Sequence, residues 1–325
     1  MNNMITVSAP GKLLLFGEHS AVYGYPCIVT AVNQRMKASV EMLNVPEFIL
    51  EAPDVKVTGY RKQMSEVGKG EIPKSAQFVE IAAKNFTEKY PMKGGIHVKT
   101  KCEFSSQFGF GSSSASTVCV MKALSELKGI KFSRKELFDL CYQTVLDIQK
   151  IGSGFDVAAA LYGGTMVFVK GGELIEPLQV NDFPLVVGYS GVKADTVSLV
   201  NDVKKKYDRE PEKVKRIFEA ITKIVDEVKE KMKEGDWERA GTLMNFNQEY
   251  LRDLGVSTEK LEAMISAAKK ADAWGAKLSG AGGGDCMIAL TPNDKKKAVA
   301  DAIKKAGGQV IDVSVNAEGV RVEHF

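Results

Sequence analysis

Three glycine-rich clusters constrain this chain more than any other feature of its sequence. They lie at residues 10–24, 109–114 and 280–284, and apolar runs flank each of them. Glycine costs backbone entropy inside regular structure, so glycines gathered between apolar runs indicate ordered loops in which the backbone turns sharply or closely approaches another group. We expect these loops to carry the function and the flanking runs to form the elements that hold them.

Length and charge restrict the class of protein. The 325 residues suffice for two domains with large buried cores. Lys and Arg number 44 against 41 Asp and Glu, and the lysines are interleaved with glutamates, which gives little support for a nucleic-acid partner. Apolar runs are too short to cross a bilayer, and the five cysteines form no CxxC pair. We expect a cytoplasmic protein without a membrane partner.

The first half of the chain is predicted to mix strands and helices. Helical spacing after the second cluster predicts a helix that ends at Gly129, and Ser133 with Glu136 forms a capping-box pattern that opens another. Residues 45–75 are weakly patterned, and we make no prediction of their structure. Alternating or buried apolar runs predict strands at 5–7, 13–16, 28–32, 36–40, 96–100 and 165–169.

Beyond residue 175 the pattern changes. A long amphipathic helix is predicted from Pro211, at its first position, to Gly235, which follows its end. The order of elements in this half is one strand, several helices, two strands, a helix and a last strand, which predicts an α+β unit with helices on one face of an antiparallel sheet. The predicted strands start at Pro184 and at residues 276 and 286, with closing strands near Val310 and Val320; further helices cover 237–251, a stretch from Ser257, and 294–305.

The second cluster, GFGSSS, stands where a strand passes into a helix. Unpaired N–H groups and the positive end of the helix dipole bind phosphate at such a point. Neighbouring serine hydroxyls add donors and an oxygen ligand for Mg²⁺. A glycine turn with serine caps would have the same sequence. The chain contains neither a Walker A motif nor a complete Rossmann fingerprint.

The first cluster sets Lys12, Glu18 and His19 at the edges of a short apolar run. Taken alone, these residues are weak evidence of function, because a solvated charge or a polar contact in the core would explain each of them. The third cluster, SGAGGGD, is too rich in glycine for an ordinary turn. A close approach of its backbone to a ligand would justify the entropy cost.

In this order the three clusters resemble the three motifs of the GHMP kinases, a family that includes galactokinase, homoserine kinase, mevalonate kinase and phosphomevalonate kinase. PGKLLLFGEHSAVYG is similar to motif one, GFGSSSAS to the phosphate loop and KLSGAGGGD to motif three. The resemblance implies an α+β fold, with a ribosomal-protein-S5-like domain over residues 1–175 and a ferredoxin-like domain over residues 176–325. It also implies ATP-dependent phosphorylation of a small molecule in the cleft between the domains, and it is compatible with a homodimer.

The resemblance also assigns residues by position. Asp156 would accept the proton of the substrate hydroxyl, and Lys12 would stabilise the transferring phosphoryl group. Ser113 and Asp147 would bind Mg²⁺, although Asp147 stands nine positions before Asp156, a different spacing from the family's glutamate, and an exposed helical acid would have the same sequence. The ATP phosphates would contact Gly109, Gly111, Ser112, Ser113 and Ser114, and the substrate would contact Glu18, His19, Thr196, Ser279 and Gly280.

Two acceptors remain open at this point. GEHSAVYGYP is similar to mevalonate kinases, whereas KIGSGFDVAAALYGG and Asp285 are more similar to phosphomevalonate kinases. We favour mevalonate, phosphorylated on its hydroxyl in the mevalonate pathway of isoprenoid synthesis. The alternatives are phosphorylation of phosphomevalonate and a non-catalytic relative that only binds a nucleotide.

Overall fold

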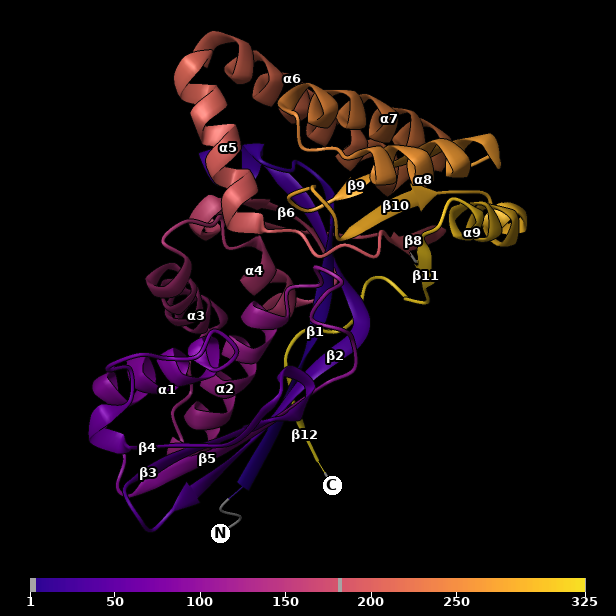
Figure 1. Cartoon of the computed structure of the whole chain (residues 1–325). Coiled ribbons are helices and arrows are strands. Elements are labelled where there is room, and N and C mark those ends of the chain that lie inside the picture. The colour runs from indigo at the N-terminus through magenta and orange to yellow at the C-terminus, as the bar shows by residue number, and fades with distance from the viewer. Residues whose placement is uncertain (1–3, 181–182, 325) are drawn as a thin grey trace.

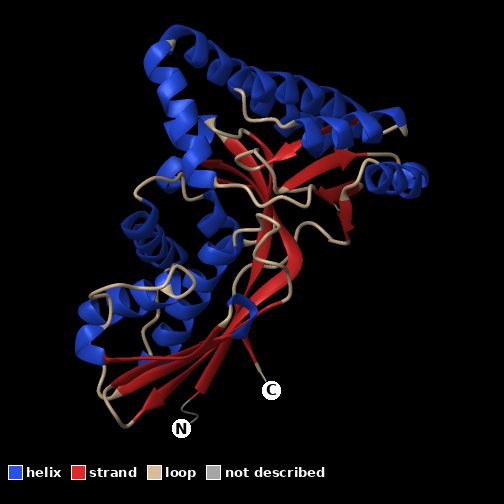
Figure 2. Cartoon of the chain, viewed as in Figure 1, coloured by secondary structure: helices blue, strands red, loops and turns tan. Residues whose placement is uncertain are grey.

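A computed structural model describes residues 4–180 and 183–324, so the outermost residues of the two predicted domains lie outside it. The described chain forms two β-sheets, each covered by helices (Figures 1 and 2). This mixed arrangement confirms the predicted α+β class. The longest strands, β1 (Met4–Phe16) and β2 (Cys27–Leu43), form an antiparallel ribbon that runs through the middle of the molecule.

The four short strands predicted in this region are wrong as separate elements. Pro10 and Gly11 do not end β1, because the register shifts there from the Pro10–Arg35 pair to the Gly11–Val32 pair. In such a bulge, residues of one strand have no partner in the other, and the pairing of both strands continues beyond it. The sheet has the order β12-β1-β2-β5-β3-β4, and β6 pairs with β2 and β7. Its other strands are β3 (Glu47–Ala52), β4 (Val57–Gln63), β5 (Gly95–Cys102), β6 (Thr165–Val169), β7 (Leu174–Leu178) and β12 (Arg321–Glu323).

Four helices cover one face of this sheet (Figure 2). They are α1 (Gln77–Lys89), α2 (Ser112–Lys128), α3 (Arg134–Gln149) and α4 (Phe155–Tyr162). α2 and α4 pack directly on β1 and β2, whereas α1 and α3 pack on α2. The predicted ends are confirmed: Gly129 closes α2 in a left-handed conformation, and Ser133 with Glu136 forms the capping box of α3.

The second sheet is antiparallel and has the order β11-β8-β10-β9. Its strands are β8 (Leu185–Tyr189), β9 (Gly275–Ser279), β10 (Cys286–Leu290) and β11 (Gln309–Ile311). Helices α7 (Trp237–Leu254), α8 (Glu259–Lys270) and α9 (Lys296–Lys305) pack on these strands, and α6 (Pro211–Glu234) packs on α7. The connection β-α-β-β-α-β with this strand order is the ferredoxin-like arrangement.

Helix α5 (Thr196–Arg209) is the element of this half that the sequence did not predict. Only Val200 and Val203 are buried on it, so its apolar pattern is too sparse to stand out. By contrast, α6 begins at Pro211 and ends before Gly235 as predicted. Short 3₁₀ turns lie at Ser20–Tyr23, Pro53–Val55, Met64–Glu66, Lys170–Gly172 and Asn293–Lys295.

The chain passes from the first sheet to the second between β7 and β8. The predicted boundary after residue 175 falls inside β7, which pairs with β6. At its far end the chain returns, because β12 pairs with β1. The first sheet therefore includes strands from both predicted stretches of sequence.

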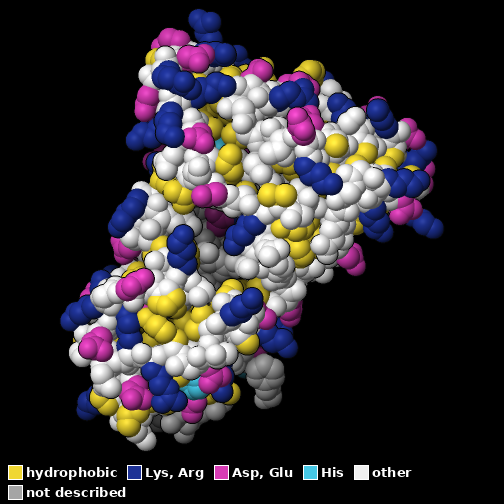
Figure 3. Space-filling view, viewed as in Figure 1, with side chains coloured by type: hydrophobic (Ala, Val, Ile, Leu, Met, Phe, Trp, Pro, Cys, Tyr) yellow, Lys and Arg dark blue, Asp and Glu magenta, His cyan; other side chains and the backbone are white. Residues whose placement is uncertain are grey.

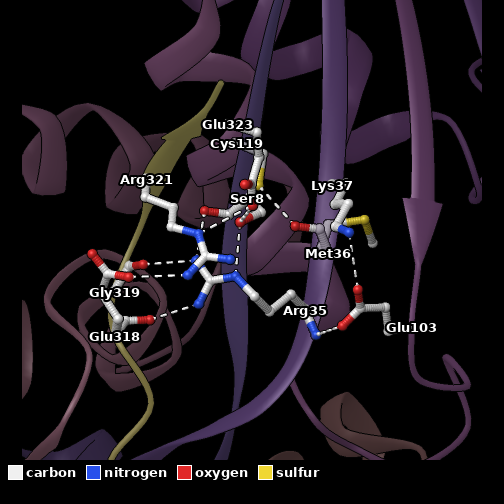
Figure 4. A network of polar contacts seen from close by, with 10 residues as sticks. All are labelled: Ser8, Arg35, Met36, Lys37, Glu103, Cys119, Glu318, Gly319, Arg321 and Glu323. Carbon is white, nitrogen blue, oxygen red and sulfur yellow. Dashed lines mark hydrogen bonds and ion pairs between the residues drawn. The ribbon is translucent and has the colours of Figure 1, made fainter. Parts of the chain in front are cut away.

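Arg35 ties this returning segment to the first sheet (Figure 4). Its Nε donates to the Ser8 hydroxyl at 2.7 Å, and its Nη1 and Nη2 donate to the carbonyls of Glu318 and Gly319, each at 2.8 Å. The Ser8 hydroxyl in turn donates to Glu323 at 2.6 Å. A buried guanidinium is tolerated here because its donors have partners in fixed directions.

The surface carries charges of both signs. Lys and Arg side chains are interspersed with Asp and Glu on the face shown in Figure 3. Within the described chain, no helix combines the length and the apolar character needed to span a membrane.

Candidate active site

Lys12 and Asp156, far apart in the sequence, form an ion pair. Lys12 lies on β1 and Asp156 in the first turn of α4, and Lys12 Nζ is 3.1 Å from Asp156 Oδ1. Lys12 Nζ also donates to the Gly109 carbonyl at 2.9 Å. The lysine side chain is only 9% exposed, whereas that of Asp156 is 35% exposed. One buried cation therefore links the second glycine cluster to a carboxylate that solvent or a ligand can reach.

The second glycine cluster leads into α2 as predicted. Gly111 is the N-cap residue of α2, with φ of 76°, and Ser112, Ser113 and Ser114 form the first turn. A methyl group on Gly109 would lie 2.4 Å from Asp285 Oδ2, and one on Gly111 would lie 3.4 Å from Asp156 Oδ1. Glycine is needed at both positions because the left-handed backbone and its neighbours leave no room for a side chain at Gly109 and little at Gly111.

A cavity of about 650 Å³ opens at the start of α2; we call it the donor cavity. Hydroxyls of Ser112, Ser113 and Ser116 line it, together with Lys74 and Lys193. The unpaired amides of the first helical turn and the two cations suit a polyphosphate. Two acids also line the cavity, but Asp54 accepts from the Cys102 amide and Glu103 pairs with Lys37. Further lining comes from Phe78, Val79, Ser105, Ser106 and Gln107, among others.

A second cavity of about 80 Å³ is lined by a different set of residues, which includes Asp156; we call it the acceptor cavity. Asp156, His19, Thr196 and Gly280 line it, as does Gln149, which the sequence did not predict. Among the described residues that line it, none is Lys or Arg. Its walls are otherwise mostly apolar: Leu14, Val22, Ile151, Phe155, Val197, Val200 and Ala281.

The Lys12–Asp156 pair connects residues that line the two cavities. Asp156 faces the acceptor cavity, and Gly111, which packs against both members of the pair, directly precedes Ser112 of the donor cavity. The face shown in Figure 3 is visibly hollowed between the two halves of the molecule.

His19 is a buried, neutral side chain in this site. Its Nε2 is 2.8 Å from the Ala281 carbonyl, which can only accept, so Nε2 carries the proton and Nδ1 is left as an acceptor. Burial lowers the pKa of His19 from 6.5 to about 4, and the bond to Ala281 opposes this only weakly. The backbone of His19 also has a φ of 61°, which is uncommon for a residue other than glycine.

Two residues that the sequence assigned to the substrate do not line the acceptor cavity. Glu18 is fully buried and pairs with Lys277 of β9, also fully buried. Burial raises the pKa of Glu18 and lowers that of Lys277. Ser279 Oγ donates to the Leu14 carbonyl at 2.9 Å and accepts from the Leu14 amide at 3.2 Å. Both residues join β9 to the β1 region, which explains their positions without a ligand.

Lys277 was the partner that sequence reasoning missed. Its signal was available, because it begins the KLSGAGGGD motif, but nothing local shows which acid a buried lysine will meet.

The third glycine cluster packs mainly on protein. A methyl group on Gly282 would lie 2.2 Å from the Val256 carbonyl, one on Gly283 2.7 Å from Leu199, and one on Gly284 2.5 Å from the Val192 carbonyl. The sequence led us to expect close approach to a ligand, but at these three positions the close neighbours belong to the chain itself. Gly280, in contrast, has open space around it and lines the acceptor cavity.

Asp147 and Ser114 line neither cavity. Asp147 is exposed on α3 and accepts from Asn85 Nδ2 and Gln143 Nε2, each at 2.8 Å. Ser114 is buried, although its backbone belongs to the first turn of α2. Across residues 4–180 and 183–324, no three His, Cys, Asp or Glu side chains converge as a metal site would require.

The two sheets, the glycine-rich start of α2 and the two cavities have the arrangement expected of a small-molecule kinase. Residues 77–164 match the N-terminal domain of the GHMP kinases, and residues 228–309 match the C-terminal domain. The chain is 38% identical to the mevalonate kinase of Pyrococcus furiosus over 331 residues, which covers 98% of both chains. The chain therefore belongs to the GHMP kinase family.

Solved structures agree with this assignment. The Methanococcus jannaschii mevalonate kinase is 26% identical, with a TM-score of 0.81 over 98% of this chain and 99% of that one. The L. major mevalonate kinase in complex with R-mevalonate is also 26% identical, with a TM-score of 0.78 over 96% of each chain.

Proposed function

We propose that this enzyme transfers the γ-phosphoryl group of ATP to the hydroxyl of mevalonate. The observation that carries the proposal is the Lys12–Asp156 pair, at 3.1 Å, which links a helix start suited to phosphate to the acceptor cavity. Full-length similarity to proteins named mevalonate kinase supports this choice of acceptor.

Each member of the pair has a role in this reaction. Asp156 accepts the proton of the attacking hydroxyl, and Lys12, held by the Gly109 carbonyl, places positive charge beside the phosphoryl group as it transfers. Positioning and electrostatic stabilisation supply most of the catalysis in phosphoryl transfer. The buried lysine suits this role because its charge is poorly screened by water.

The donor cavity fits Mg-ATP. The amides of the first turn of α2 and the hydroxyls of Ser112 and Ser113 face the phosphates, with Ser113 as the protein's oxygen ligand for Mg²⁺. When bound, Mg²⁺ neutralises phosphate charge. Since Asp147 points elsewhere, most ligands of the ion would be phosphate oxygens and water, which Mg²⁺ readily keeps.

The acceptor cavity favours an acceptor without a phosphate. A phosphate group carries about two negative charges at neutral pH and is normally held by Arg or Lys, and the described lining of this cavity includes neither. A single carboxylate can be held by neutral donors of the kind that Thr196 and Gln149 provide. Phosphomevalonate is the second candidate, favoured by Asp285 and the GSGFD sequence.

We further propose that the enzyme works in the cytoplasm. All five cysteines are free, and four are buried, which fits a reducing compartment. Every proposed site residue comes from one chain, and a homodimer is compatible with that arrangement.

A coupled assay of ADP release tests the proposal. With Mg-ATP, mevalonate should release ADP with a far higher kcat/KM than phosphomevalonate. Turnover of phosphomevalonate alone would transfer the assignment to the second candidate. Binding of ATP without turnover of either compound would indicate a non-catalytic relative.

A further inference from the structure

One short segment borders both cavities. Residues 190–197, here called the bridging segment, comprise the connection from β8 to α5 and the first two residues of α5. Lys193 lines the donor cavity, whereas Thr196 and Val197 line the acceptor cavity. The segment is largely exposed, so its own side chains bury too little to fix its course across the cleft.

Asp285 supplies three of its anchors. The Asp285 amide donates to the Val192 carbonyl at 2.7 Å, the Asp285 carbonyl accepts from the Ser190 amide at 2.9 Å, and the carboxylate accepts from the Ala194 amide at 2.9 Å. Two of these bonds use only backbone atoms. The third depends on the side chain, and it holds the segment directly beside Lys193.

The same carboxylate touches the phosphate loop. Its Oδ2 occupies the space where Gly109 would carry a side chain. Asp285 is buried, and its φ of 52° lies in the left-handed region, which Asn and Asp adopt more readily than other residues with a side chain. Burial raises the pKa of Asp285, while Ala194 and the charges of Lys12 and Lys193 oppose that rise. This buried carboxylate therefore contacts the bridging segment and the phosphate loop at once, and is placed to hold the two together.

We propose that Asp285 is a positioning residue: its carboxylate fixes the bridging segment against the phosphate loop so that Lys193 faces the phosphates of the nucleotide. The inference rests on the proposed function, because it takes ATP as the ligand of the donor cavity. It gives a role in that function to Lys193 and Asp285, for which the motifs imply none. Lys193 contributes a charge-assisted contact, and Asp285 acts through it.

Two substitutions of Asp285 distinguish its positioning role from the effect of its negative charge. D285G removes the carboxylate and suits the left-handed backbone, so it should fold. D285N removes the negative charge but keeps an oxygen that accepts from Ala194, and asparagine also tolerates this conformation. K193A removes the cation itself. K215A, on an exposed position of α6 outside both cavities, is the matched lysine control.

The test is calorimetric titration with Mg-ATP without acceptor, followed by steady-state kinetics. We expect K193A and D285G each to weaken Mg-ATP binding about 10-fold, the size of one charge-assisted hydrogen bond, and to raise KM for ATP with little change in kcat. D285N and K215A should bind as wild type. The double variant D285G/K193A should be no weaker than either single one, because both remove the same contact.

Unchanged affinity in D285G, equal losses in D285N and D285G, or multiplying losses in the double variant would overturn the inference. A wild-type protein that binds Mg-ATP but does not turn over mevalonate would instead overturn the proposed acceptor, and the comparison of affinities would still stand.

Discussion

His19 shows how burial sets the chemistry of a single side chain in this cleft. The imidazole is neutral because burial lowers its pKa to about 4, and its Nδ1 is left free to accept a hydrogen bond. A group with a lowered pKa in the folded state binds its proton more tightly when unfolded. Its contribution to stability is therefore present above pH 6.5 and is lost as the pH falls towards 4.

The substitution His19→Asn tests this reading of the site. Asparagine tolerates the positive φ but does not titrate. The free energy of unfolding of the wild type should fall between pH 6.5 and pH 4 by up to about 3 kcal/mol more than that of H19N. Urea unfolding of both proteins across this range measures the difference. Parallel pH profiles would show that His19 is not the titrating group.

At the same scale, the motifs led sequence reasoning to Lys12, His19 and Gly280, and the positions implied by the family resemblance added Asp156 and Thr196. Glu18 and Ser279 also stand inside motifs, yet they hold β9 to the β1 region. Motif position alone does not distinguish a residue that lines a cavity from one that builds its wall. Only the partners Lys277 and Leu14, distant in sequence, make that distinction.

At the scale of elements, the junction between the phosphate loop and α2 depends on its glycines. Gly109 and Gly129 have nearly equal φ angles, of 71° and 69°, but their surroundings differ. A methyl group on Gly109 would meet Asp285, whereas one on Gly129 would meet nothing within 4 Å.

The pair of substitutions G109A and G129A separates backbone strain from contact. Each should lose about 1 kcal/mol of stability to the left-handed backbone. G109A should in addition displace the loop and weaken Mg-ATP binding at least 10-fold, while G129A should bind within about twofold of wild type. Calorimetric titration measures both. Equal ATP affinities would show that the loop tolerates a side chain beside Asp285.

Elements were predictable where local chemistry marks their ends. Pro211 with Gly235 and Ser133 with Glu136 marked α6 and α3 correctly. The prediction failed at Pro10 and Gly11, which usually interrupt a strand but here lie opposite a bulge of β2 between Val32 and Arg35. It also missed α5, whose buried face amounts to Val200 and Val203. In both cases the outcome depends on packing partners that a local pattern does not contain.

On the scale of the whole molecule, buried polar contacts join the two sheets next to the cleft. Lys277 pairs with Glu18, Ser279 bonds to Leu14, and the Gly17 amide donates to Asn247 Oδ1 at 3.4 Å. Lys12 lies on β1 and Gly280 directly follows β9. These contacts therefore also fix the position of one wall of the cleft relative to the other.

Lys277→Met should therefore destabilise the whole protein. Leaving Glu18 buried without its partner should cost about 3–5 kcal/mol of unfolding free energy. K205M removes the exposed Lys205–Asp202 pair and should change stability by less than about 1 kcal/mol. Urea unfolding measures both, and a loss in K277M no greater than in K205M would contradict a structural role for the buried pair.

The central claim is that the Lys12–Asp156 pair performs phosphoryl transfer to mevalonate. Its most direct test is a single-turnover measurement of label transfer from the γ-phosphate of ATP to mevalonate, in wild type and in D156N, with Mg-ATP affinity measured in parallel. The wild type should yield labelled phosphomevalonate. D156N should transfer about 10²–10⁴-fold more slowly with ATP affinity nearly unchanged. Transfer by D156N at the wild-type rate would contradict the account.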